Sequence, residues 1–287
     1  MRVPVVHSFY HKETGTWSYV VADPATRVAV IIDPVLDYDA KSGRTSTNSA
    51  DVLINTVLEN TFQLAWILET HAHADHLSAA PHIKKNLGGR IAIGRGITQV
   101  QKTFKPIFNL GADFATDGSQ FDHLFDADEI FNVGQFEARV IATPGHTNDS
   151  VSYLIGDAVF VGDSLFMPDG GTARCDFPGG SAAILYQSIH GLFTLPDETR
   201  MFVCHDYSPG GREPHCETTV GEQKLKNIHV AETITETQFI AMRQARDATL
   251  GMPALIIPAV QVNIAAGAFP KMEDNGVSYL KTPINTL

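Results

Sequence analysis

The chain has 287 residues, enough for one large domain or two small ones. It is 44% hydrophobic and 18% charged, a balance typical of a globular protein with a sizeable core. The formal net charge of −11, without a long basic run, argues against nucleic acid or an anionic membrane surface as a partner.

Nothing in the sequence has the character of a targeting or membrane-spanning segment. The first residues lack the apolar run of a signal peptide. The most apolar stretch, 252–268, is interrupted by two prolines, a glutamine and an asparagine. The three cysteines, Cys175, Cys204 and Cys216, are too few and too scattered for a disulfide framework. We therefore expect a cytoplasmic protein with no membrane partner.

The first third of the sequence predicts strands separated by turns, with helices after them. Alternating apolar residues predict a hairpin with strands Trp17–Ala22 and Arg27–Ile32. A polar loop then leads into a predicted helix at Ala50–Glu59. The elements expected next are a buried strand at 64–70, a helix at 78–89 that ends at Gly88-Gly89, and a strand at 90–94.

The second half resembles the first in organisation, without a close sequence repeat. Its predicted elements are a strand at 136–142, a hairpin turning at Gly156-Asp157, a helix at 181–195 and a last strand at 200–207. Strand-rich halves that are each followed by a helix predict two sheets packed face to face, with helices outside. We expect one or two helices between 219 and 250, and an irregular apolar tail.

Side chains that can bind metal gather directly after the predicted strands. One strand is followed by four of them and three later strands by one each: His71, His73, Asp75, His76, His146, Asp163 and His205. Residues two apart in an extended segment face the same way, so His71 and His73 can point into one cleft. We predict that all seven converge on a metal site. The other histidines are interpreted as ordinary surface or core residues: His7, His11, His82, His123, His190, His215 and His229.

The segments "THAHADH", "TPGHT", "VGDSLF" and "VCHDY", in this order, resemble the metallo-β-lactamase fold superfamily, and within it the glyoxalase II-like branch. The resemblance runs from about Thr16 to Tyr207. It implies an α/β fold, the αββα sandwich, with two mixed sheets face to face and the metal cleft at one edge. It also implies a single domain over residues 1–287, with a helical C-terminal extension from about residue 215. All seven positions that hold two metals in dinuclear relatives are present, so ligand identity alone does not decide the metal count.

The segment "GGTARCDFPGGSA", residues 170–182, resembles the arginine-aspartate-phenylalanine loop of the persulfide dioxygenases, and the C-terminal segments resemble their longer bacterial members. This resemblance implies one Fe(2+) per chain held by His71, His146 and Asp163, with three coordination positions open. The implied reaction is oxidation of glutathione persulfide by O2 and water to sulfite and glutathione, in sulfide detoxification. The remaining four residues would then orient ligands and water by hydrogen bonds: His73, Asp75, His76 and His205.

The alternative is a dinuclear hydrolase, such as a hydroxyacylglutathione hydrolase or a lactonase. All seven residues are then ligands, Asp163 bridges two zinc or iron ions, and the substrate is a thioester, a lactone or a similar acyl compound. A third class, a noncatalytic sulfide- or metal-responsive binding protein, is disfavoured because a binding module does not need open coordination positions. A homodimer is the expected assembly.

Three residues outside the ligand set are candidates for substrate binding or redox chemistry. Arg174 is predicted to hold a carboxylate of glutathione, because its planar guanidinium matches that group; the alternative is a structural ion pair with Asp176. Tyr207 is predicted to donate a phenolic hydrogen bond to the substrate. Cys175 is a candidate redox-sensitive thiol, because the adjacent cation can lower its pKa. An inert thiol is the alternative.

Overall fold

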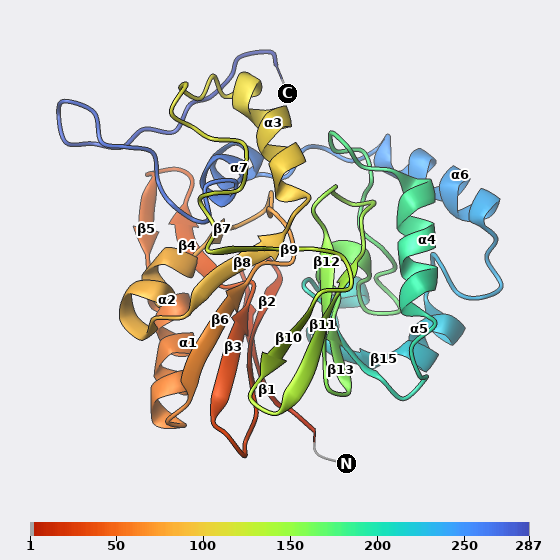
Figure 1. Ribbon diagram of the computed structural model, residues 1–287. Helices are drawn as coiled ribbons and strands as arrows, with labels where there is room; N and C mark the ends of the chain where they lie inside the picture. Colours follow the sequence, from red (N-terminus) through yellow and green to blue (C-terminus); the bar gives the residue numbers. More distant parts are fainter. Residues whose placement is uncertain (1–2, 287) are drawn as a thin grey trace.

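Two six-stranded sheets packed face to face form the centre of the computed structural model, which describes residues 3–286 (Figure 1). The first sheet has the order β1 (Val5–His11), β2 (Thr16–Ala22), β3 (Val28–Ile32), β6 (Gln63–Leu68), β8 (Arg90–Gly94) and β9 (His123–Phe125). The second has the order β10 (Ile130–Val133), β11 (Phe136–Ala142), β12 (Val151–Ile155), β13 (Ala158–Phe160), β14 (Arg200–Phe202) and β15 (Glu217–Thr219). Each contains parallel and antiparallel pairs, which confirms the predicted mixed sheets.

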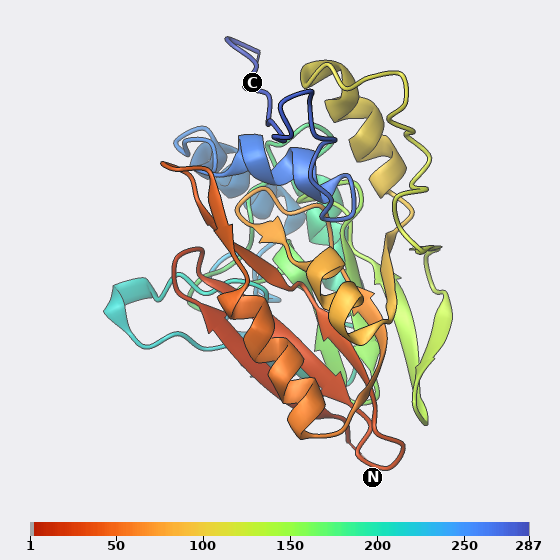
Figure 2. The same cartoon turned by 90° about the vertical axis from the view of Figure 1, so that its left-hand side faces the viewer.

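Helices cover the outer faces of both sheets, as predicted for the αββα sandwich (Figures 1 and 2). The outer face of the first sheet shares one apolar cluster with α1 (Asn48–Glu59), α2 (Ala80–Leu87), α3 (Ile97–Ile107) and α7 (Ile256–Asn263). The outer face of the second sheet shares another with α4 (Ala182–Leu192), α5 (Val220–Lys226) and α6 (Glu236–Asp247). Among residues 3–286, no helix has the length and apolarity needed to cross a membrane.

The position of strand β2 between two apolar layers explains why most of its residues are apolar. Tyr19 and Val21 point into the space between the two sheets, whereas Val20 and Ala22 point to the outer helices. Because side chains alternate along a strand, a segment with apolar layers on both faces, here Tyr19–Ala22, is apolar at every position. The sheets are thereby held together by an inner cluster rich in aromatic rings.

Two buried tyrosines connect the loops at one edge of the sandwich to the opposite sheet. Tyr153 of β12 donates a hydrogen bond to the carbonyl of Glu69, which follows β6, at 2.8 Å. Tyr19 of β2 donates to the carbonyl of Val203, which follows β14. Each of these carbonyls lies two residues before a predicted metal ligand. The packing of the sheets therefore fixes where those two ligand-bearing loops begin.

Glycines shape the other two loops at this edge. Gly145 has φ of +139°, and a Cβ there would lie 2.4 Å from the backbone of Leu185 in α4. Gly162 has φ of +52°, and a Cβ there would lie 2.7 Å from Thr70 Oγ1. Both positions need a residue without a side chain, and each directly precedes a predicted ligand.

Four regions differ from the sequence-based predictions. The predicted polar loop contains a hairpin of β4 (Val35–Asp39) and β5 (Arg44–Ser46), and β4 also pairs with β7 (Leu77–Ser78). Strand β5 is wholly exposed, so it carries no alternation of apolar residues. Helix α3 lies in the middle section, where no element was predicted. Strand β15 follows β14, which is therefore not the last strand.

The predicted irregular tail contains helix α7. Its sequence includes Pro258 and Asn263, which argue against a helix when taken alone. Pro258 lies in the first turn, where a missing N–H is tolerated. Asn263 is buried and donates hydrogen bonds to the carbonyls of His73 and His76, at 2.7 and 2.8 Å. Tertiary contacts with the loop after β6 therefore stabilise a helix that local propensity does not predict.

His229 gives a prediction for the stability of this fold. It is buried and accepts a hydrogen bond from the Thr172 N–H at Nδ1, at 2.9 Å. Burial, with Arg243 and Arg246, lowers the pKa of His229 from 6.5 to about 4. Between these two values the unfolded chain binds a proton that the folded chain does not bind, so the stability contributed by His229 falls as the pH drops. The whole effect is up to about 3 kcal/mol.

The measurement is urea unfolding of the wild-type chain and of His229→Gln at pH 7, 6 and 5. The free energy of unfolding of the wild type, minus that of the variant, should decrease as the pH falls. His215→Gln, at an exposed histidine, is the control. A wild-type advantage that does not change with pH would contradict the assignment.

Candidate metal centre

The structure brings the seven predicted ligands together at one edge of the paired sheets. Six are buried, and Asp75 is half-buried. They form two groups in which the ligand atoms lie within 4.8 Å of one another. The first group is His71, His146 and Asp163, and the second is His73, Asp75, His76 and His205.

Asp163 faces both groups. Its Oδ2 lies 3.8 Å from Nε2 of His71 and 3.5 Å from Nε2 of His146. Its Oδ1 lies 3.3 Å from Nε2 of His205. Donor atoms bound at zinc distances to one tetrahedral ion lie about 3.4 Å apart. The spacing of these atoms therefore suits shared ions, with one carboxylate oxygen directed to each group.

The donor atoms fit a metal because most of them have no other partner. Within residues 3–286, the buried atoms of this set without a hydrogen bond are His71 Nε2, His73 Nδ1 and Nε2, Asp75 Oδ2, His76 Nε2, Asp163 Oδ1 and His205 Nε2, although His73 Nε2 lies 3.0 Å from Asp33 Oδ1. A buried polar atom left unpaired costs about 1–3 kcal/mol. So many unpaired atoms at one point are accounted for by coordination to positive ions.

The ring nitrogens that face away from the cleft are held by neighbours. Thr70 donates its hydroxyl proton to Asp33 at 2.9 Å, so its oxygen is free to accept from His71 Nδ1, at 3.1 Å. His146 Nδ1 donates to the carbonyl of Arg174 at 2.7 Å. These contacts fix the proton on Nδ1 and leave the Nε2 lone pair for a ligand.

The electrostatics favour the neutral imidazole at His71 and His73, whereas at His205 the carboxylates of Asp163 and Asp75 outweigh burial and raise the pKa. Burial, together with the adjacent His73, lowers the pKa of His71 well below its usual value. Burial and the adjacent His76 do the same for His73. Metal ions bind the neutral form of histidine, so the environment keeps these rings in their ligand state.

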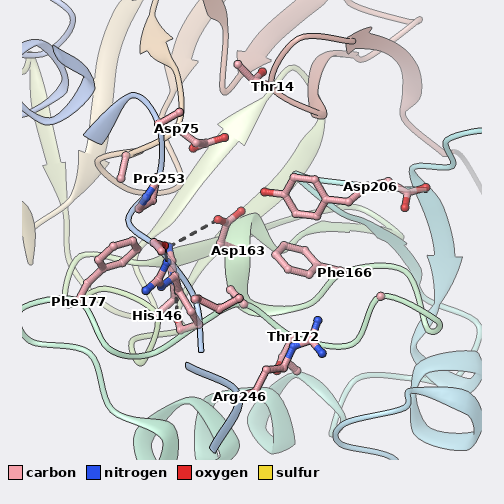
Figure 3. Close-up of a pocket in the computed structure, with 18 of the residues that line it drawn as sticks. Thr14, Asp75, His146, Asp163, Phe166, Thr172, Phe177, Asp206, Arg246 and Pro253 are labelled. Atoms are coloured by element: carbon pink, nitrogen blue, oxygen red, sulfur yellow. Dashed lines mark hydrogen bonds and ion pairs between the residues drawn. The ribbon is translucent and has the colours of Figure 1, made fainter. Parts of the chain in front are cut away.

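A cavity of about 580 Å³ opens over His146 and Asp163, which Figure 3 shows joined by a dashed line. Phe166 and Phe177 line it, and so does the segment Leu250–Leu255 that follows α6. A largely apolar cavity of this size with a few polar groups at its base suits a small molecule.

The predicted substrate-binding residues both line this cavity. Arg174, however, makes two hydrogen bonds of 2.6 Å to the carboxylate of Asp176 and a third to the carbonyl of Gly251. This geometry favours the structural ion pair that the sequence left as the alternative. Tyr207 stacks on the ring of His205, with ring centroids 5.7 Å apart.

Cys175 does not lie in an environment that promotes thiol reactivity. Its side chain is buried, and burial raises the pKa of the thiol to about 12. The thiolate is the reactive form, and here it is scarcely populated at neutral pH. The geometry therefore favours the inert thiol over the redox-sensitive one.

Sequence reasoning missed Arg246, which reaches the cavity from the last turn of α6. Three arginines line the cavity, and two are paired: Arg174 with Asp176, and Arg243 with Asp247. Within the described residues, the exposed side chain of Arg246 has no hydrogen-bond or ion-pair partner. The spacing of Arg243 and Arg246 predicts that they share a helix face, but only the structure places that face at the cavity.

A family model for the metallo-beta-lactamase superfamily matches residues 11–205. This chain therefore belongs to the metallo-beta-lactamase superfamily, which confirms the resemblance and the fold expected from the sequence. Metal binding is a property of that superfamily. The donor set of histidine and aspartate does not by itself select iron over zinc.

Three relatives are about half identical to this chain. A beta-lactamase hydrolase-like protein of Xylella fastidiosa is 51% identical over 100% of this chain and 66% of its own length. A probable metallo-hydrolase of Burkholderia pseudomallei is 50% identical over 98% of this chain and 99% of its own length. Glyoxylase B2 of Dictyostelium discoideum is 50% identical over 98% and 97%. The chain thus spans slightly less than two thirds of the first relative and nearly all of the other two.

These relatives overturn the prediction of a persulfide dioxygenase. The mitochondrial persulfide dioxygenase ETHE1 of Homo sapiens is only 29% identical, over 92% of this chain. The crystal structure of ETHE1 from Myxococcus xanthus has a TM-score of 0.73 at 32% identity, covering 92% of this chain and 100% of that chain. Relatives at 50–51% identity instead carry hydrolase or glyoxylase names. The motif behind the prediction misled because Arg174 and Asp176 pair with each other to shape their loop.

Metal loading should stabilise the protein measurably. An ion that binds only the folded chain adds about 2.7 kcal/mol at a free concentration 100 times its Kd. For a domain of this size, the unfolding midpoint should rise by roughly 5–10 °C. Calorimetry of the chelator-treated protein, with and without added Zn²⁺ or Fe²⁺, measures this shift. The His215→Ala variant should keep the whole metal-induced rise in the unfolding midpoint, and His71→Ala should lose much of it. Equal rises in the two variants would refute the metal site.

Proposed function

We propose that this chain is a dinuclear metal-dependent hydrolase that cleaves the thioester or lactone bond of a small acyl compound. The observation that carries the proposal is the orientation of Asp163, whose two carboxylate oxygens face different groups of histidines. A single-ion site would leave His76 Nε2 buried and unpaired, and would leave His205 Nε2 facing only the carboxylates of Asp75 and Asp163, at 3.2 and 3.3 Å. The names of the half-identical relatives support the same reaction class.

The donor set divides between two ions. His71 and His146 would hold one, His76 and His205 with Asp75 the other, and Asp163 both. The ring of His73 lies between these sets, with its centroid 3.9 Å from that of His71 and 4.2 Å from that of His76. When bound, the ions supply a nucleophilic water of lowered pKa and polarise the carbonyl of the substrate.

The residues of the chain position the substrate above this centre. Phe166 and Phe177 give the cavity apolar walls that pack against the acyl or thiol part and exclude bulk water. Tyr207, which stacks on His205, is the proposed phenolic donor to the substrate. Arg246 is the proposed partner of a substrate carboxylate, because Arg174 and Arg243 already bind carboxylates. These features favour a thioester that carries a carboxylate, as acyl-glutathione compounds do.

We also propose that the whole chain is one domain, with a helical extension from about residue 215. Phe239 of α6 belongs to the apolar cluster of the second sheet, and Ile256 and Val260 of α7 belong to that of the first. The extension also supplies Arg246 and one wall of the cavity. On this proposal the extension completes the substrate site.

The test is hydrolysis of S-lactoylglutathione, and of a lactone, by protein loaded with zinc or with iron. The expected products are the free acid with the thiol, or the ring-opened acid. Asp163→Asn should lower kcat by about 100-fold or more, because it removes a carboxylate that serves both groups. Absence of turnover with every thioester and lactone, in both metal forms, would refute the proposal.

Arg246 should control substrate affinity rather than the chemical step. A hydrogen bond to a charged group contributes about 1.5–3 kcal/mol, which corresponds to a tenfold or larger rise in KM for Arg246→Ala. The kcat should change less than about twofold, since uniform binding is lost. Lys85→Ala, at an exposed cation of α2, is the matched control. Steady-state kinetics with an unchanged KM would remove Arg246 from the site.

A further inference from the structure

A chain of buried polar side chains runs behind the second group of donors. Thr16, the first residue of β2, has no exposed surface. Its Oγ1 lies 3.5 Å from His76 Nδ1 and 3.3 Å from His205 Nδ1. The same oxygen lies 2.7 Å from Thr14 Oγ1, which lies 2.8 Å from His11 Nδ1. His11, which the sequence analysis treated as ordinary, is therefore connected to two of the metal-facing histidines.

Counting protons gives this hydrogen-bond network a direction. With Nε2 given to a metal ion, His76 and His205 each carry their proton on Nδ1, which reaches Thr16 Oγ1 in both cases; the carbonyl of Gly15 is a second acceptor beside His205. A hydroxyl has two lone pairs and one proton. When both histidines donate to Thr16 they use both of its lone pairs, and its own proton then goes to Thr14.

The direction continues to the surface. Thr14 receives the proton of Thr16 and donates its own to His11 Nδ1, so His11 accepts at Nδ1 and carries its proton on Nε2. That nitrogen faces Asp37 Oδ1 at 3.3 Å and Glu13 Oε2 at 3.4 Å. Asp37 is itself held by the backbone N–H and the hydroxyl of Ser49, at 3.0 and 2.6 Å. In this order every donor of the network has an acceptor, and both metal-facing histidines keep the tautomer that leaves Nε2 free for a metal ion.

The neutral state of His11 is consistent with this order. Its side chain is only 10% exposed, and burial lowers its pKa below the usual value despite the nearby Glu13 and Asp37. Only the neutral ring can accept a hydrogen bond at Nδ1.

The first group of donors is oriented by different partners. His71 is held by Thr70, and His146 by the carbonyl of Arg174. Within the described residues, no hydrogen bond joins Thr70 or the carbonyl of Arg174 to Thr16, Thr14 or His11. The network behind His76 and His205 is therefore separate from the one behind His71 and His146, although Asp33, which accepts from Thr70, also lies 3.0 Å from Nε2 of His73.

We propose that His11, acting through Thr14 and Thr16, is a positioning residue that sets the tautomers of His76 and His205 and so controls binding of the second metal ion independently of the first. This inference rests on the two-ion site proposed above. Partners that orient metal ligands typically change metal affinity by about 10–100-fold when they are removed. Loss of this hydrogen-bond network should therefore weaken the binding of one ion and leave the binding of the other unchanged.

The experiment is titration of the metal-free chain with Zn²⁺ against a chromophoric chelator, which gives the number of ions and the Kd of each. The wild type should bind two. Thr16→Val, which keeps the shape but removes the acceptor, should weaken one ion by about 10–100-fold and leave the other within about twofold. Thr70→Val is the reciprocal variant and should weaken the other ion. Activity is not needed for this measurement.

Two substitutions at His11 test the outer end of the hydrogen-bond network without altering strand β2. His11→Phe removes the acceptor and should weaken the same ion as Thr16→Val does. His11→Asn places an amide oxygen near the position of Nδ1 and should restore most of the affinity. His82→Phe, at a histidine distant from Thr16 in the hydrogen-bond network, is the control. Circular dichroism of each metal-free variant checks that it is folded.

The outcomes separate the two proposals. A wild type that binds two ions, with both affinities unchanged in His11→Phe and Thr16→Val, would overturn this inference and leave the hydrolase standing. A wild type that binds a single ion would overturn the two-ion site and this inference with it. Should Thr16→Val fail to fold, the contrast between His11→Phe and His11→Asn decides the question.

Discussion

The structure depends on holding buried, otherwise unpaired donor atoms from two different sheets close to one another. His71 follows a strand of the first sheet, whereas Asp163 and His205 follow strands of the second. Each unpaired atom costs free energy until an ion is bound. The apolar layer between the sheets, and the tyrosines that donate to loop carbonyls across it, keep the loops in place. Folding thus forms a centre whose unpaired donor atoms cost free energy, and metal binding recovers that free energy.

The helix α6 connects the outer layer to the substrate cavity. Its fully buried Arg243 donates to the carbonyl of Thr172 at 2.9 Å, and Asp247 accepts from the N–H of Cys175 at 2.8 Å. The loop that contains Thr172 and Cys175 also carries Arg174, whose carbonyl orients His146. One helix therefore holds the loop that supports a ligand, and the same helix presents Arg246 to the substrate. In the loop motif, Arg174 and Asp176 pair with each other, whereas Phe177 lines the cavity.

Much of the fold and most of the site followed from the sequence, for reasons that particular residues illustrate. The apolar run of β2 and the glycines before His146 and Asp163 carry strong local constraints, so these strands and turns were predicted. Strand β5 is short and exposed, and α7 contains a proline and an asparagine, so neither has a local signal that outweighs the alternatives. The persulfide dioxygenase prediction was wrong: it rested on one loop and the tail, whereas relatives at 50–51% identity carry hydrolase or glyoxylase names.

The sequence by itself determined which side chains could bind metal and which strands deliver them, because spacing along a strand fixes the direction of each side chain. It did not determine which acceptor most ring nitrogens meet, because the acceptors of His76, His205 and His146 come from distant segments: Thr16 and the carbonyl of Arg174. The role of His11 and the unpaired state of the Arg246 side chain among the described residues were likewise decided only by tertiary contacts. Proton direction and charge pairing depend on neighbours in space, and the linear order of residues does not contain them.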